Sequence, residues 1–310
     1  MLIQITNKCN ELCKHCMVSA SPDGLDSTME QVEDICKYLR LTTPIIAVVS
    51  GGEITCSNQW FEKISRIIET VKEYNGTVVL ESNASWFWDG RWDEVSGKFR
   101  ELLNHECVAC CQFSSHKLYY PNYEKFVSYM PKMRKFHPKV NAVIDWQGDK
   151  TNLVRLGRAK NILKPEEVTG NPSCSSLVSR MVQFNSYSPI DSSYPAFMRS
   201  LFINGYYCKP MVYVPNGNVY FGESIFCKPV DNIYNHLKLP EKAQLQSIKD
   251  WWEKMKKGYT CCNACNACKN VDPSLIEYFK EFNFHFGEFD EKTSTNNLKQ
   301  IHTSDNFETQ

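Results

Sequence analysis

The 310-residue sequence predicts an α/β fold, a partial (β/α)6 TIM-like barrel followed by a small C-terminal module built from a β-hairpin and a helix. The first observation is that short apolar runs alternate with segments of helical periodicity, which is typical of parallel strands connected by helices. The second is that about six such units fit into residues 1–200, whereas a full barrel has eight units in about 250 residues. The third is a change of composition after residue 200, which predicts a separate module.

The strands and helices of the barrel are predicted from local patterns. The run IIAVVS, bounded by Pro44 and Gly51, has the continuous apolar character of a buried parallel strand. Val32, Ile35 and Leu39 share one face of a helical segment. The same reasoning predicts, in chain order, strand 1–6, helix 28–40, strand 45–50, helix 59–73, strand 77–82, strand 107–113, helix 121–136, strand 139–146, helix 153–163 and strand 180–187.

Residues 201–275 are predicted to form the C-terminal module. Within them MVYVPNGNVYFG predicts a β-hairpin that turns at Asn216-Gly217. A helix is expected at about 241–257, ahead of the cysteine-rich run CCNACNACKN. Residues 276–310 are predicted to form a C-terminal helix and a loosely held tail, because their last part is polar and nearly devoid of large apolar side chains.

Composition and charge disfavour some classes of function and favour others. The 35 basic and 35 acidic residues give a formal net charge of zero, and the absence of a long basic run disfavours nucleic-acid binding. The sequence has no N-terminal leader pattern and no window near the roughly 18 apolar residues of a membrane span. We therefore expect a cytoplasmic protein with no membrane partner. Fifteen clustered cysteines then favour metal or cluster ligation over a disulfide framework.

The first cysteine group follows the first predicted strand directly. Cys9, Cys13 and Cys16 have the spacing CxxxCxxC. A structural zinc site requires four ligands, usually as two pairs in one module. Three thiolates can instead hold three irons of a [4Fe–4S] cluster and leave the fourth iron open to an exogenous ligand. A zinc site and a disulfide-linked group are the alternatives at this point.

The CxxxCxxC loop in this place resembles the radical S-adenosylmethionine (radical SAM) superfamily. The resemblance implies that the open iron binds the amino and carboxylate groups of S-adenosylmethionine (SAM). It also implies that the reduced cluster cleaves SAM to methionine and a 5′-deoxyadenosyl radical, which abstracts a substrate hydrogen. Asn10 after the first cysteine is typical of the family. The aromatic residue that the family places near the adenine, just before the third cysteine, is His15 in this sequence.

A second motif, Gly51-Gly52-Glu53, ends the second predicted strand. The C-terminal ends of parallel strands are where α/β barrels place their chemistry. Two glycines let the backbone approach a ligand closely, and the glutamate adds an acceptor. In the radical SAM family this GGE turn binds the methionyl ammonium of SAM. An ordinary strand-to-helix turn is the alternative, but the preceding CxxxCxxC loop favours the cofactor site.

The third and fourth strands also end in polar residues. Ser82 and Asn83 lie where the family often has a polar pair near the cofactor, and Ser114 lies where it often has a serine beside the SAM carboxylate or ribose. The sequence departs from the family pattern two positions later, where His116 replaces a common acidic residue. The arginine often found about a dozen residues on is also missing, and Lys125 is the nearest cation.

A second cysteine group flanks the predicted hairpin. Cys208-x13-Gly222-x4-Cys227 resembles the opening of the SPASM and twitch modules that follow many radical SAM domains. The shorter twitch form implies one auxiliary [4Fe–4S] cluster, for which four cysteine ligands suffice. The remaining two ligands are expected among Cys261, Cys262, Cys265 and Cys268, as the pair Cys262/Cys265 or the pair Cys265/Cys268. A four-cysteine zinc site is the alternative.

Several other conspicuous side chains are predicted to have no part in the chemistry. Buried strand and helix thiols behave as small hydrophobic groups, and this interpretation covers Cys36, Cys107, Cys110 and Cys111. Arg155 and Arg158 are predicted to be solvated rather than to anchor an anionic substrate.

The sequence as a whole predicts a radical SAM oxidoreductase. The expected substrate is a small polar molecule such as a cyclitol or sugar, with the auxiliary cluster taking the second electron. An external electron donor of the flavodoxin or ferredoxin type is expected as a partner. The alternatives are a maturase that modifies a ribosomally synthesised peptide and a non-catalytic iron–sulfur sensor or electron carrier. No residue is assigned as the catalytic acid or base.

Overall fold

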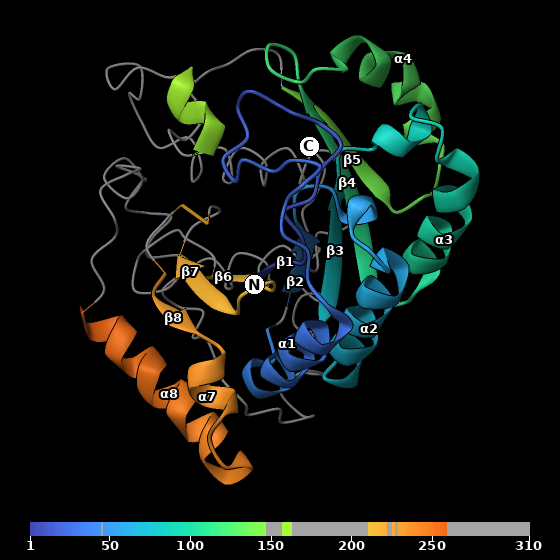
Figure 1. The fold of residues 1–310 in the computed structure, drawn as a ribbon. Helices are drawn as coiled ribbons and strands as arrows, with labels where there is room; N and C mark the ends of the chain where they lie inside the picture. The colour runs from blue at the N-terminus through green and yellow to red at the C-terminus, as the bar shows by residue number, and fades with distance from the viewer. Residues whose placement is uncertain (45, 147–156, 163–209, 222–224, 227–228, 259–310) are drawn as a thin grey trace, which may run out of the picture.

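The computed structural model describes residues 1–44, 46–146, 157–162, 210–221, 225–226 and 229–258. These residues form one eight-stranded sheet with the order β5-β4-β3-β2-β1-β6-β7-β8 (Figure 1). The strands are β1 Leu2–Gln4, β2 Ile46–Ser50, β3 Thr77–Ser82, β4 Val108–His116, β5 Val140–Trp146, β6 Pro210–Tyr213, β7 Asn218–Phe221 and β8 Asp231–Asn232. The helices are α1 Met29–Thr42, α2 Trp60–Glu73, α3 Trp92–Asn104, α4 Tyr123–Arg134, α7 Tyr234–Leu237 and α8 Glu241–Gly258.

Strands β1 to β6 form the parallel part of the sheet. Each pairs in parallel with its neighbour, and α1 to α4 cover one side of it (Figure 1). This confirms the predicted α/β alternation. The strand predicted at 180–187, the expected sixth of the barrel, lies outside the described residues. No helix within the described ranges is both long enough and apolar enough to cross a membrane.

The predicted hairpin is present and turns at Asn216 and Gly217, the latter with φ +71°. Its first strand, β6, pairs in parallel with β1, on the edge opposite to β2. β7 and β8 then continue the sheet in antiparallel fashion. The hairpin therefore extends the same sheet that carries the first cysteine group.

Helix α1 begins with a capping box. The Thr28 hydroxyl accepts a hydrogen bond from the Gln31 backbone N–H, and the Gln31 side chain accepts one from the Thr28 N–H. The same Gln31 side chain donates to the Pro215 carbonyl at 2.8 Å. The start of α1 is therefore tied to the hairpin turn.

Helix α3 was not predicted. The sequence leaves 92–104 unassigned because Asp, Glu, Lys and Arg interrupt the apolar residues and Gly97 lies in the middle. The structure buries Val95, Phe99 and Leu103 on one face, at helical spacing. Packing of this face against the sheet stabilises the helix despite the glycine.

An aromatic cluster fixes the segment that follows β3. Trp86, which is fully buried, lies in a 3₁₀ turn, Ser85–Phe87. Its ring centroid lies 5.3 Å from that of Phe99, 5.9 Å from that of Phe113 and 5.1 Å from that of Phe136. Such edge-on and tilted contacts stabilise cores beyond the area they bury. The turn after β3 is thereby held rigidly beside the cysteine loop.

Candidate active site

The first three predicted cysteines lie on a loop whose two ends are joined. The Asn7 N–H donates to Leu25 O at 2.7 Å, and the Cys9 N–H donates to Ser21 O at 2.9 Å. The Ser21 N–H returns a bond to Asn7 O at 3.1 Å. The loop from Cys9 to Ala20 is therefore closed at its stem, above the C-terminal end of β1.

This loop faces a cavity of about 260 Å³ at the C-terminal ends of the parallel strands. The structure brings together there most of the predicted cofactor-binding and metal-binding residues of the barrel. The predicted residues that line the cavity are Cys9, Cys13, His15, Cys16, Gly51, Gly52, Asn83 and Ser114. Glu53 and Ser82 are not among the described residues that line it.

The three cysteines of the loop carry free thiols. Burial raises the pKa of Cys9 and of Cys13 well above the ordinary thiol value, so neither ionises near neutral pH without a bound cation. No three His, Cys, Asp or Glu side chains in the described part of the chain are arranged around a single metal ion. A cubane cluster is held differently, by one thiolate on each iron, and so needs thiols around a common space. Three thiols on one cavity fit such a cluster.

The two glycines after β2 pack against the stem of the cysteine loop. The Gly52 N–H donates to Thr6 O at 2.9 Å, and the Glu53 N–H donates to Lys8 O at 2.8 Å. A Cβ atom on Gly52 would lie 2.3 Å from Lys8 O, and one on Gly51 would lie 2.6 Å from Thr6 O. Glycine is therefore required here by the close approach of the chain to itself, while the same turn lines the cavity.

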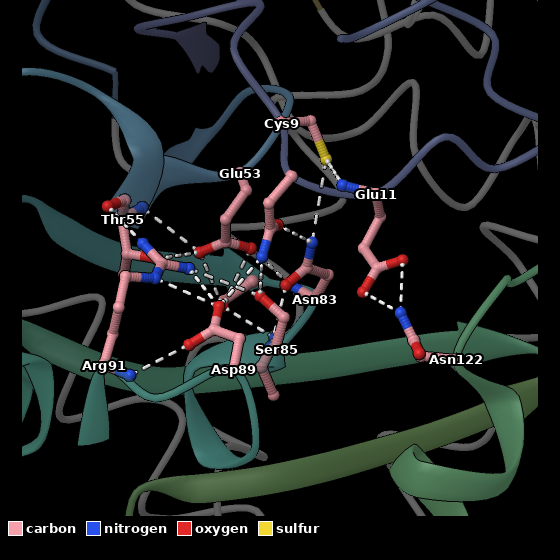
Figure 2. Close-up of polar contacts among 12 residues, drawn as sticks. Cys9, Glu11, Glu53, Thr55, Asn83, Ser85, Asp89, Arg91 and Asn122 are labelled. Atoms are coloured by element: carbon pink, nitrogen blue, oxygen red, sulfur yellow. Dashed lines mark hydrogen bonds and ion pairs between the residues drawn. The ribbon is translucent and has the colours of Figure 1, made fainter. Parts of the chain in front are cut away.

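Glu53 lies beneath the cavity wall rather than on it. Its side chain is 1% exposed. The carboxylate accepts hydrogen bonds from the Thr55 hydroxyl at 2.8 Å, the Ser82 hydroxyl at 2.9 Å and the Asn83 backbone N–H at 2.7 Å (Figure 2). Burial raises the pKa of Glu53, and these donors oppose that effect. The carboxylate thus joins the ends of β2 and β3.

Replacing Glu53 with glutamine tests this role. The amide group would meet N–H and O–H donors, so one of them would lose its acceptor, and we expect the free energy of unfolding to fall by about 2 kcal/mol. Urea denaturation measures the change. Glu62→Gln, at an exposed position in the first turn of α2, is the matched control and should lose only about 0.5 kcal/mol, from its charge near the helix N-terminus. Equal stability of the two variants would contradict the assignment.

His15 packs in a group of three rings at the edge of the cavity. Its ring centroid lies 4.9 Å from that of His116 and 5.9 Å from that of Tyr119. Burial, then His116 and Arg158, lower the pKa of His15 to about 3. The imidazole is therefore neutral at physiological pH. The His116 ring completes the group, with its centroid 4.9 Å from that of Tyr119.

Arg158 contacts the cysteine loop, and the prediction that it is solvated was wrong. Its guanidinium donates to Cys13 O at 2.8 Å and to Ala20 O at 2.7 Å. Its backbone N–H donates to Cys16 O at 3.0 Å. The preceding Gly157 has φ +52°, and a Cβ atom there would lie 2.6 Å from the same Cys16 carbonyl oxygen. Arg155 lies outside the described residues.

Three further residues that line the cavity, Glu11, Ser115 and Tyr120, were not predicted. Glu11, within the cysteine loop, is buried, and both of its carboxylate oxygens accept from the Asn122 amide, at 2.8 and 3.0 Å. Tyr120 donates its hydroxyl to Asn83 O at 3.2 Å. Ser115 is buried at the C-terminal end of β4. Only the position of Glu11 between two predicted ligands could have indicated it beforehand.

The remaining predicted cysteines divide into two groups. Cys36, Cys110 and Cys111 are buried, which confirms that these thiols belong to the packed interior. Cys107 packs against the same core in a partly buried position. The predicted ligands of the second group, Cys208, Cys227, Cys262, Cys265 and Cys268, lie outside the described residues, as does Cys261.

No family model and no curated protein sequence matches the chain. Among solved structures it is similar to Streptococcus suis SuiB bound to S-adenosylmethionine, with a TM-score of 0.41, 11% identity and coverage of 93% of this chain and 76% of SuiB. It is also similar to SuiB bound to the precursor peptide SuiA, with a TM-score of 0.42, 12% identity and coverage of 92% of this chain and 73% of SuiB. A third similar structure is native anSMEcpe with bound AdoMet, with a TM-score of 0.36, 15% identity and coverage of 97% of this chain and 96% of that chain. Because these scores are low, the functional proposal rests on the residues of the site itself.

Proposed function

We propose that the chain is a radical SAM enzyme in which Cys9, Cys13 and Cys16 hold a [4Fe–4S] cluster with one open iron. The observation that carries the proposal is that these three thiols and the Gly51-Gly52 turn line one cavity. This cavity lies at the C-terminal ends of parallel strands, where α/β barrels place their chemistry.

We assign a role to each group of residues around the cavity. When bound, the cluster supplies the electron that cleaves SAM to methionine and a 5′-deoxyadenosyl radical. Gly51, Gly52 and Ser114 present the polar groups that would bind the amino, carboxylate and ribose groups of SAM, and Asn83 lines the cavity beside them. The neutral His15 ring supplies a flat surface at the position that the family uses near the adenine. Glu53 and Ser82 lie behind the cavity wall and hold the ends of β2 and β3 together. We therefore expect Glu53→Ala to weaken SAM binding by loosening these strand ends.

Cleavage of SAM tests the proposal directly. The full chain, reconstituted anaerobically with iron and sulfide and reduced with dithionite, should release 5′-deoxyadenosine from SAM, as measured by liquid chromatography and mass spectrometry. The variant with Cys9, Cys13 and Cys16 all replaced by alanine should release none. A reconstituted chain that holds iron and binds SAM without cleaving it would instead support a sensor or electron carrier.

The second cysteine group is proposed to hold an auxiliary [4Fe–4S] cluster through Cys208, Cys227 and either the pair Cys262/Cys265 or the pair Cys265/Cys268. The triple alanine variant of the first group should therefore retain about four irons per chain, because four cysteines suffice for one such cluster. Iron and zinc content per chain, measured by plasma emission, checks this expectation. Loss of all iron, or zinc in its place, would contradict it.

The substrate is proposed to be a small polar molecule whose oxidation delivers a second electron to the auxiliary cluster. This rests on the resemblance of the segment from Cys208 to Cys227 to twitch modules. Electrons would come from a flavodoxin- or ferredoxin-type donor in the cytoplasm. Tight binding of a leader peptide, measured by calorimetry, would instead favour the maturase alternative.

A further inference from the structure

The hydrogen bonds around Asn83 fix which end of its side-chain amide faces Cys9. The Asn83 Oδ1 atom accepts a bond from the backbone N–H of Ser85 at 2.9 Å. A backbone N–H only donates, so turning the amide round would bring two donors together. The Nδ2 group therefore points to Cys9 Sγ at 3.6 Å and to Asn10 Oδ1 at 3.2 Å (Figure 2). The longer distance to sulfur reflects its larger radius.

The orientation of Asn10 is fixed in the same way. Its Nδ2 group donates to Asp89 Oδ2 at 2.9 Å and to Ser85 Oγ at 2.7 Å. A carboxylate accepts only, so Asn10 must present its oxygen to Asn83. Asp89 is itself held by the Arg91 guanidinium, with Nη2 at 2.7 Å and Nε at 3.0 Å from Oδ2 (Figure 2). An ion pair therefore anchors a directed chain of amides that ends at the Cys9 sulfur.

The backbone of Asn83 is held from two more sides. Its N–H donates to Glu53 at 2.7 Å, and its carbonyl accepts from the Tyr120 hydroxyl at 3.2 Å. Both partners are almost completely buried. Main chain and side chain of Asn83 are thus fixed together, so the donor aimed at Cys9 is organised before any cofactor binds.

Cys9 receives a second donor from its own loop. The backbone N–H of Glu11 lies 3.4 Å from Cys9 Sγ. Hydrogen bonds donated to a cluster's sulfur ligands are one of the means by which a protein sets the reduction potential. They stabilise the extra negative charge of the reduced state, and so they raise the potential.

We propose that Asn83 is a positioning residue that raises the reduction potential of the cluster held by Cys9 through its amide donor to the Cys9 thiolate. This role rests on the proposed function. It differs from the contact with SAM that the sequence predicts for Asn83, because the group it acts on is a ligand of the cluster. Glu53, Asn10 and Tyr120 act through Asn83 by fixing its orientation.

Two replacements of Asn83 test the role in the full, reconstituted chain. Asn83→Leu removes the donor, and Asn83→Asp keeps the Oδ1 acceptor for Ser85 while it turns a negative oxygen toward the sulfur. Both should shift the midpoint potential to more negative values, and Asn83→Asp should shift it further. The potential is followed by redox titration of the electron paramagnetic resonance signal that changes when SAM is added. This choice separates the first cluster from an auxiliary one.

Ser85→Ala is the matched control. It removes one hydroxyl that accepts from Asn10, but Asp89 still fixes Asn10 and the Ser85 N–H still orients Asn83, so its potential should equal that of wild type. Unchanged potentials in both Asn83 variants would overturn the proposal, and so would folded variants that no longer bind iron, since Asn83 would then build the site rather than tune it. If the wild-type chain forms no SAM-responsive cluster, the proposed function itself fails.

Discussion

Replacing Arg158 with alanine is expected to lower the free energy of unfolding by about 3 kcal/mol and to reduce iron binding by the cysteine loop. The guanidinium donates to Cys13 O and Ala20 O, and hydrogen bonds from a charged donor contribute about 1.5 kcal/mol or more each. Without these two hydrogen bonds, Cys13 in the middle of the cysteine loop is no longer connected through Arg158 to Ala20 at its end. Urea denaturation and iron content per chain after reconstitution measure the two effects.

Lys160→Ala provides the control for this experiment. Lys160 lies in the same 3₁₀ turn, Gly157–Asn161, and is exposed. Its replacement should leave stability and iron content unchanged, since surface substitutions without a specific contact usually have small effects. If Arg158→Ala matched Lys160→Ala in both measurements, the hydrogen bonds from Arg158 would contribute nothing to the stability of the cysteine loop or to its iron binding.

Replacing Gly52 with alanine is expected to cost about 3 kcal/mol of folding free energy, at the upper end for overpacking. The new Cβ atom would lie 2.3 Å from Lys8 O and 2.8 Å from Lys8 C, both backbone atoms that cannot rotate away. The stem of the cysteine loop must therefore move, and the hydrogen bond from the Glu53 N–H to Lys8 O must lengthen or break. Denaturation measures the loss, and the affinity for SAM should fall with it.

The matched control for Gly52 is Gly97→Ala in helix α3. A Cβ atom at Gly97 meets nothing within 4 Å, and alanine favours a helix interior over glycine by about 0.5–1 kcal/mol. This variant should be more stable than wild type. A Gly52→Ala variant that was also stabilised would show that the turn and the stem do not touch as described.

The strands and most helices could be predicted because their signals are local. The predicted strand 77–82 and helix 59–73 coincide with β3 and, within one residue, with α2. Helix α3 was missed because its apolar face has only four residues and because the helix contains a glycine on its exposed side. The pairing of β6 with β1 could not be predicted either, since nothing in two short apolar segments specifies a partner about 200 residues away.

The residues of the candidate site were predicted where their signal is local and missed where it depends on long-range contacts. The cysteine spacing and the two glycines are short motifs, so the residues on the cavity wall were predicted from them. Arg158 makes its contacts across more than 130 residues of chain, and RLGR has no feature that sets it apart from a surface segment. Glu53 shows a further limit, because a motif indicates that a carboxylate is needed without indicating whether it faces a ligand or its own backbone.

The pairing of β6 with β1 has a consequence for the order in which the chain folds during synthesis. Leu2 pairs with Met211 and Gln4 with Tyr213, so one edge of β1 has no partner until about 200 further residues have emerged from the ribosome. An open strand edge is a template for pairing with another chain. The strand that leads into the cysteine loop therefore keeps an open edge through the synthesis of β2 to β5 and is enclosed only when β6 is made.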